Sequence, residues 1–255
     1  MIGPDDRGFT LGDGLFETVL AEAGALRWLD AHLERMTAGC AVLGLPAPGR
    51  GAAERLMTAA LAEAGVTKVR AAVRLTLSAG PGGRGLERPA VLSPTLVATA
   101  AAAPLSAGPA RLITATVRRN DRSPASRLKT LSYLDNILAR AEAVAAGGDE
   151  ALMLNTRGQV ACAAAANVFW VTEAQLFTPA LDCGVLAGTA RARLLEAAAT
   201  MGRPVQEVRV GPEALAGAEG IFLTSSLAGA RWAETLDGRP VGPGGQAAAL
   251  VESLS

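Results

Sequence analysis

The sequence contains few of the residues that build metal centres and hydrolytic sites. It has one histidine and three cysteines among 255 residues. A multi-histidine zinc site is therefore excluded, and the cysteines form neither a CxxC pair nor an even disulfide framework. The single histidine, His32, lies in a helical pattern, and no Gly-x-Ser-x-Gly motif is present. A hydrolytic triad is therefore not expected.

The chain also lacks an excess of charge and any long apolar run. Its 24 basic residues balance 24 acidic ones, so we expect neither nucleic acid nor an anionic membrane surface as the main partner. No apolar run approaches the roughly 20 residues that span a bilayer. The first residues contain no apolar core of a secretory signal. Together with the reduced thiols expected here, these features predict a cytoplasmic protein.

Lysine is almost absent, whereas arginine is abundant. Of the 24 basic residues, all but Lys68 and Lys129 are arginine. A guanidinium stays protonated, but a lysine amine can lose its proton and form an imine with a carbonyl compound. Lys129 is therefore a candidate for amine chemistry. The alternative, that a lysine is simply retained on the surface, is the better interpretation for Lys68.

The periodicity of apolar residues predicts an α+β protein with two lobes. A Pro/Gly/Ser-containing linker over 103–109 separates a small N-terminal α/β lobe, 1–105, from a larger C-terminal lobe, 110–255, in which we place Lys129. A glycine-rich turn followed by a strand is predicted within 8–20. Helices are predicted over 30–43, 52–64, 132–146, 188–201 and 246–254. Further strands are predicted over 26–29, 69–78, 92–98, 112–117, 151–154, 167–171, 204–210 and 221–226.

Two turns are candidates for binding an anion. Gly188 and Thr189 lie in the first turn of a predicted helix, where unpaired N–H groups and the positive end of the helix dipole favour a phosphate. Thr224, Ser225 and Ser226 follow a predicted strand and supply hydroxyl donors. Each pattern alone is more often a helix cap or a polar turn.

Arg35 follows His32 by three residues, so both side chains lie on one face of the predicted helix. Taken alone, this pair indicates a solvated arginine beside a packed histidine. An anion-binding arginine is the alternative.

Seven short motifs together resemble those of class IV aminotransferases, the fold-type IV enzymes that use pyridoxal 5′-phosphate (PLP). They occur in the family's order and extend over nearly the whole chain. The motifs are GDGLFET (12–18), AHLER (31–35), LKTLSYLDN (128–136), DEAL (149–152), ANVF (166–169), TPAL (178–181) and GVLAGTAR (184–191). The resemblance implies the two-lobed fold of D-amino acid aminotransferase, a small-molecule amino substrate, and a homodimer with the cofactor between the lobes.

The resemblance also implies roles for individual residues. Lys129 would hold PLP as a Schiff base and act as the general acid and base. Arg35 would bind the cofactor phosphate. Ala187, Gly188 and Thr189 would donate hydrogen bonds to the same phosphate through their backbone N–H groups. Ser225 and Ser226 would donate through their hydroxyls.

The sequence departs from the family pattern at two places. The family has a glutamate that holds the pyridine N–H, two residues after the valine of its Gly-x-Val motif. Here that position is Cys162, followed by a run of alanines. A neutral thiol is a poor partner for a pyridinium, so we expect a weaker electron sink. The chain also begins almost at its DRGF sequence (6–9), where the family has an earlier strand, so we expect a trimmed or differently built edge.

Within the family, the sequence favours 4-amino-4-deoxychorismate lyase, which releases pyruvate and 4-aminobenzoate in folate synthesis. The segments RRNDRSP (118–124), GGRG (82–85) and SSLAG (225–229) resemble the lyases. Cys162 points the same way, because transamination depends more strongly on a protonated ring than the lyase step does. The alternatives are an aminotransferase of branched-chain or D-amino acids, and a PLP-binding protein with little activity.

Substrate contacts are expected from an aromatic residue, the arginine-rich loop and the single tyrosine. Three arginines in one loop could instead be solvated, and the tyrosine could only pack. The candidates are Phe16, Arg118, Arg119, Arg122 and Tyr133.

Overall fold

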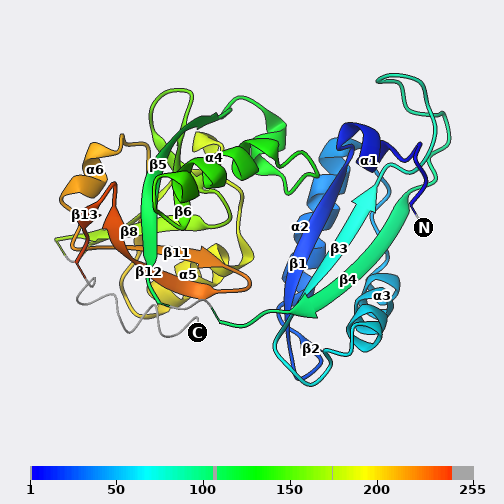
Figure 1. Ribbon diagram of the computed structural model, residues 1–255, viewed down its shortest axis with the longest axis horizontal. Coiled ribbons are helices and arrows are strands. Elements are labelled where there is room, and N and C mark those ends of the chain that lie inside the picture. Colours follow the sequence, from blue (N-terminus) through cyan, green and yellow to red (C-terminus); the bar gives the residue numbers. More distant parts are fainter. Residues whose placement is uncertain (1, 106–107, 174, 243–255) are drawn as a thin grey trace. The chain divides into compact units, whose positions relative to one another are not determined.

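The chain folds into two compact units (Figure 1). The computed structural model describes residues 2–105, 108–173 and 175–242, so the predicted helix over 246–254 lies outside the described residues. The first unit is Met1–Leu105 with Leu128–Ser132, and the second is Ser106–Arg127 with Tyr133–Ser255. No helix among the described residues is long and apolar enough to cross a membrane.

The segment with Lys129 belongs to the first unit, not to the C-terminal lobe in which the sequence analysis places it. The Phe16 N–H donates to the Lys129 carbonyl at 2.9 Å, and the Leu131 N–H donates to the Gly14 carbonyl at 3.0 Å. These bonds join the segment to the edge of a strand that lies more than one hundred residues earlier. Hydrophobic periodicity does not predict such a long-range pairing.

The first unit is an antiparallel sheet packed against two helices. The sheet order is β2 (Ala25–Leu26), β1 (Gly14–Glu22), β3 (Ala71–Ser78) and β4 (Thr95–Ala102). Helix α2 (Leu29–Leu43) packs on β1, and α3 (Arg50–Glu63) packs on β3 and β4. The short helix α1 (Arg7–Leu11) precedes β1 where the sequence predicts only a turn, because the Asp6 side chain accepts the Gly8 N–H and caps it.

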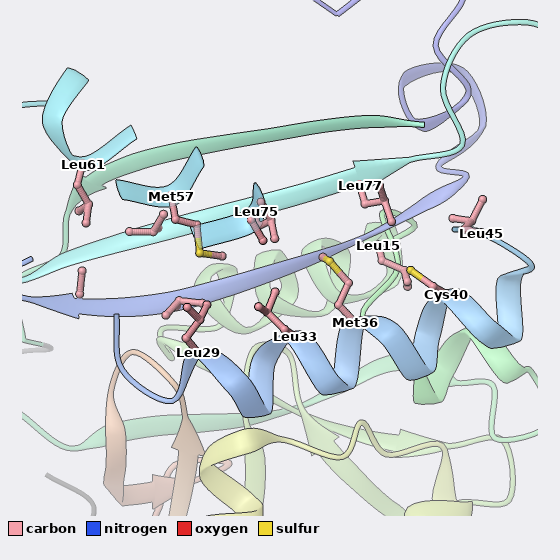
Figure 2. Packing of buried hydrophobic residues seen from close by; sticks show 14 of the residues in the cluster. Leu15, Leu29, Leu33, Met36, Cys40, Leu45, Met57, Leu61, Leu75 and Leu77 are labelled. Atoms are coloured by element: carbon pink, nitrogen blue, oxygen red, sulfur yellow. The ribbon is translucent and has the colours of Figure 1, made fainter. Parts of the chain in front are cut away.

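Alternate residues of β1 and β3 form the core of this unit with one face of each helix. Leu15 of β1 and Leu75 of β3 lie against Met36 of α2 and Met57 of α3 (Figure 2). These side chains are almost fully buried. Because side chains alternate along a strand, Phe16 projects from β1 on the face opposite Leu15, toward the segment with Lys129.

The second unit is built on a nine-stranded sheet of mixed direction, in the order β10-β9-β8-β11-β12-β5-β6-β7 with β13 beside β12. Its strands are β5 (Ala110–Arg119), β6 (Glu150–Asn155), β7 (Val160–Ala163), β8 (Asn167–Thr172), β9 (Gln175–Pro179), β10 (Val205–Val208), β11 (Gly220–Ser225), β12 (Gly229–Leu236) and β13 (Arg239–Pro240). Its helices are α4 (Leu134–Ala145), α5 (Thr189–Thr200) and α6 (Glu213–Ala216).

The sequence predicts α4, α5 and most of these strands, but not β7, β9, β12, β13 or the short helix α6. Strand β7 has the sequence VACA and is completely buried. Alanine has a low strand propensity, so burial and pairing decide this segment rather than local preference. In the first unit, the strands predicted over 26–29 and 92–98 have different bounds in the structure, where they are β2 (Ala25–Leu26) and β4 (Thr95–Ala102).

We predict that Gly14→Ala destabilises the first unit and displaces the Lys129 segment. A Cβ atom at this position would lie 2.3 Å from the Leu77 carbonyl oxygen and 2.8 Å from Leu131 Cδ1. Overpacking of this kind costs about 1–3 kcal/mol. Gly217→Ala is the control, because a Cβ there meets nothing within 4 Å and its φ is −104°. Urea unfolding measures both variants, and equal stability of the two would contradict the prediction.

Candidate active site

Lys129 and Phe16 form the first part of the candidate site, within the first unit. The Lys129 Nζ atom lies 4.2 Å from the centre of the Phe16 ring. The Arg74 guanidinium of β3 lies 3.6 Å from the same ring. The Leu15–Thr130 bridge holds the Lys129 backbone beside β1, and the side chain is half-buried. The apolar ring therefore covers one side of the amine, as in a cation–π contact.

Arg35 lies in a charged cluster on the opposite face of β1. Its Nε atom donates to Glu17 Oε1 at 2.8 Å, and its Nη2 atom donates to Glu17 Oε2 at 2.5 Å. The His32 Nδ1 atom lies 2.7 Å from Glu17 Oε2. Burial alone would raise the pKa of Glu17, but hydrogen bonds and positive charge from Arg35 and His32 lower it. The carboxylate therefore stays ionised.

The turn before α5 is shaped by a close approach between Gly188 and Asn167. Gly188 is the extended N-cap residue of α5, and a Cβ atom there would lie 2.1 Å from Asn167 Oδ1. The Asn167 Nδ2 atom donates to the Leu186 carbonyl at 2.9 Å. Thr189 is buried and Ala187 is exposed. Asn167 lies in the ANVF motif (166–169) but is not among the site residues predicted from the sequence. Asn167 fixes the turn that precedes the first N–H groups of the helix.

The end of β11 lies beside this turn, because Thr224 of β11 pairs with Asn167 of β8. The Thr224 Oγ1 atom is buried and has no hydrogen-bond partner among the described residues. Ser225 Oγ accepts the Ala228 N–H at 3.1 Å, and Ser226 is half-buried. A buried hydroxyl without a protein partner is unusual and is suited to a ligand. Thr224 is one of the hydroxyl donors predicted from the sequence, beside Ser225 and Ser226.

Cys162 lies in β7, opposite Met153 of β6. It is 5% exposed and packs in a cluster composed mostly of alanines. Burial raises the pKa of its thiol, and the negative charge of Glu150 raises it further, whereas the positive charge of Arg119 opposes this. The side chain is therefore a neutral thiol near both a carboxylate and a guanidinium.

Arg119 is buried, and its guanidinium is bound within the protein. Its nitrogens donate to the Gly184 carbonyl, the Asn136 side-chain oxygen and the Ser126 carbonyl. These contacts assign Arg119 to holding the second unit together, a different role from the substrate contact that the sequence analysis expects. All three acceptors are neutral.

The remaining substrate candidates are Arg118, Arg122 and Tyr133. Arg118 is exposed, and its Nη1 atom donates to the carbonyls of Ala115 and Thr116. Arg122 is exposed, and Tyr133 is half-buried at the start of α4. For these three residues, substrate binding stays a prediction.

The structure thus groups the candidates within each unit. Lys129 and Phe16 lie on one face of β1, and Arg35 lies on the other, all in the first unit. In the second unit, the turn at Gly188 lies beside the end of β11. The first group combines a lysine amine with an aromatic ring, and the second combines helix N–H groups with hydroxyls. The first group could form an imine with an aldehyde, and the second could bind an anion.

Comparison with known proteins identifies relatives of the whole chain. Residues 14–233 match the family described as Amino-transferase class IV. A bifunctional aminodeoxychorismate lyase and D-amino acid transaminase from Mycobacterium tuberculosis is 29% identical over 94% of this chain and 87% of its own length.

Two solved structures share the fold over the full chain. A 4-amino-4-deoxychorismate lyase from Pseudomonas aeruginosa is 32% identical, with a TM-score of 0.87, and the match covers 100% of this chain and 93% of that one. A hypothetical aminotransferase from Mycobacterium tuberculosis in its PLP-bound form is 27% identical, with a TM-score of 0.87, and covers 100% and 92%. The fold is therefore that of the fold-type IV PLP enzymes.

Proposed function

This chain belongs to the class IV aminotransferase family, and we propose that within this family it is a 4-amino-4-deoxychorismate lyase. Members of the family are PLP enzymes, so the cofactor of this enzyme is PLP. The proposed products are pyruvate and 4-aminobenzoate. The observation that supports the lyase most directly is Cys162, a neutral thiol where the family has a glutamate.

We assign the cofactor contacts to the residues that fit its chemistry. Lys129 supplies the amine for the imine bond. Arg35, the N–H groups of 187–189 and the hydroxyls of 224–226 bind the phosphate. The buried Thr224 hydroxyl, which has no hydrogen-bond partner among the described residues, and the glycine turn beside it support a bound anion in the second unit.

Lys129 moves protons in the proposed reaction. With PLP bound, Lys129 would hold it through Nζ, and the Nζ amine, when not bonded to the cofactor, would accept the proton that leaves the substrate ring carbon. The Phe16 ring, 4.2 Å from Nζ, limits hydration on one side of the amine. Arg118, Arg122 and Tyr133 are the proposed contacts for the substrate carboxylates and ring.

Cys162 supports the lyase over a transaminase for an electrostatic reason. When bound, PLP supplies an electron sink whose depth depends on protonation of its pyridine nitrogen. The Cys162 thiol is neutral because burial raises its pKa, so it does not hold that proton as a carboxylate does. Loss of pyruvate makes the substrate ring aromatic and tolerates a weaker sink, whereas transamination depends more strongly on a deep one.

An aminotransferase of branched-chain or D-amino acids is the second candidate. This candidate includes D-amino acids because the relative from Mycobacterium tuberculosis bears both the lyase and the D-amino acid transaminase activity in its name. A PLP-binding protein with little activity is the third candidate.

We further propose that the enzyme is a cytoplasmic homodimer that serves folate synthesis. The support is the family resemblance and the absence of a membrane-spanning helix among the described residues.

A substrate panel distinguishes the three candidates. The purified holoenzyme should convert 4-amino-4-deoxychorismate to pyruvate and 4-aminobenzoate faster than it transaminates D-alanine or leucine with 2-oxoglutarate. Lys129→Ala should lose both reactions, and Lys68→Ala, which changes an exposed lysine, should keep them. Faster transamination would support the second candidate. No turnover of any substrate would support the third.

Cys162→Glu should raise transamination relative to lyase turnover, by about tenfold for each pKa unit gained by the pyridine nitrogen. The fold should accept this change because the buried Arg119 guanidinium, whose positive charge reaches Cys162, has only neutral acceptors in the contacts described above. Cys162→Gln is the control of equal shape without charge. Loss of PLP or of stability, or equal activity ratios for the two variants, would count against the role assigned to Cys162.

Light scattering of the holoenzyme should give twice the mass of one chain. A monomer that binds PLP and turns over substrate would contradict the proposed homodimer.

A further inference from the structure

Glu17 is a carboxylate on a strand face that otherwise supplies the hydrophobic core. Its neighbours on that face of β1, Leu15 and Val19, are 2% and 0% exposed. The Glu17 side chain is 1% exposed. An ionised carboxylate at such a position is strongly unfavourable unless it is paired and hydrogen-bonded.

Both Glu17 oxygens are bound by two residues on one face of α2. Arg35 binds Oε1 through Nε at 2.8 Å and Oε2 through Nη2 at 2.5 Å. His32, which is fully buried, binds Oε2 through Nδ1 at 2.7 Å. His32 and Arg35 are three residues apart, so one helix face presents both donors to the strand.

Stability alone is a weak explanation for this cluster. Apolar residues of similar volume often stabilise a core as well as a buried ion pair does. A bidentate pair has a geometric effect that one contact lacks, because two parallel hydrogen bonds fix both the plane and the direction of the guanidinium. The Arg35 side chain is 16% exposed, in contrast to 1% for Glu17. Arg35 is therefore the member of the cluster that extends toward the surface.

Strand β1 connects this cluster to the lysine. Phe16, next to Glu17, bonds through its N–H to the Lys129 carbonyl and contacts Lys129 Nζ with its ring. Consecutive residues of one strand therefore hold the lysine on one face and the arginine on the other, all within the first unit.

We infer that Glu17 is a positioning residue that orients Arg35 to bind the phosphate of the cofactor. The inference rests on the proposed function, in which Arg35 binds that phosphate. His32 supports Glu17 by donating from Nδ1 to Oε2, the oxygen that also accepts from Arg35 Nη2. Glu17 itself does not touch the cofactor.

The test compares the affinities of the full-length apoprotein for PLP and for pyridoxal, which forms the same imine but has no phosphate. Imine absorbance gives both dissociation constants. Arg35→Ala should weaken PLP binding by about ten- to a hundredfold and leave pyridoxal binding unchanged. Glu17→Gln, which keeps the shape and removes the charge, should weaken PLP binding by about tenfold, as loss of an orienting partner does at metal sites. Adding Glu17→Gln to Arg35→Ala should have little further effect.

The control is Glu54→Gln, which removes an exposed carboxylate paired with Arg50 and should leave both constants unchanged. A Glu17→Gln variant that weakens PLP and pyridoxal binding equally, or neither, would overturn the inference while leaving the role of Arg35 intact. An unchanged ratio of the two constants in Arg35→Ala would instead remove Arg35 from the phosphate, and the inference with it.

Arg35→Lys decides the case if Glu17→Gln does not fold. Lysine keeps the positive charge but cannot bind both oxygens of Glu17 in one plane. A loss of PLP affinity close to that of Arg35→Ala, with pyridoxal binding retained, would support positioning. An affinity for PLP equal to that of the wild type would overturn it.

Discussion

The pairing of the Lys129 segment with the start of β1 is the constraint on which the first unit's chemistry depends. Two backbone bonds, from Phe16 to Lys129 and from Leu131 to Gly14, fix the lysine beside an aromatic ring. Gly14 permits this pairing because any side chain there would collide with the neighbouring strand. From the same strand, Glu17 reaches the opposite face and holds Arg35. One strand therefore places two side chains of unlike chemistry on its two faces.

The second unit depends on a comparable pairing, between β8 and β11. That pairing aligns Asn167 with Thr224, and Asn167 in turn contacts the glycine turn before α5. The first N–H groups of α5 and the buried Thr224 hydroxyl then lie in one region of the second unit. Helix N–H groups and hydroxyls are suited to an anion, and the turn needs a glycine at 188 because the Asn167 side chain approaches it closely.

The sequence allowed the α+β class, most elements and the family to be predicted, because long periodic segments and ordered motifs depend on local chemistry. It also singled out Lys129, since only two lysines occur. The assignment of the Lys129 segment to the first unit could not be predicted, because it depends on pairing with a distant strand. The buried role of Arg119 was missed for the same reason, since its acceptors at Ser126, Asn136 and Gly184 come together only in the fold. Strand β7 could not be predicted because the alanines in its sequence have a low propensity for strands.

The proposed function depends on Lys129 as the residue that holds the cofactor. Borohydride reduction of the PLP-loaded protein, followed by mass mapping of its peptides, measures this most directly. We expect a pyridoxyl adduct on Lys129 in the wild type and no pyridoxyl adduct in Lys129→Ala. An adduct confined to Lys68, or no adduct in protein reconstituted with PLP, would contradict this role of Lys129.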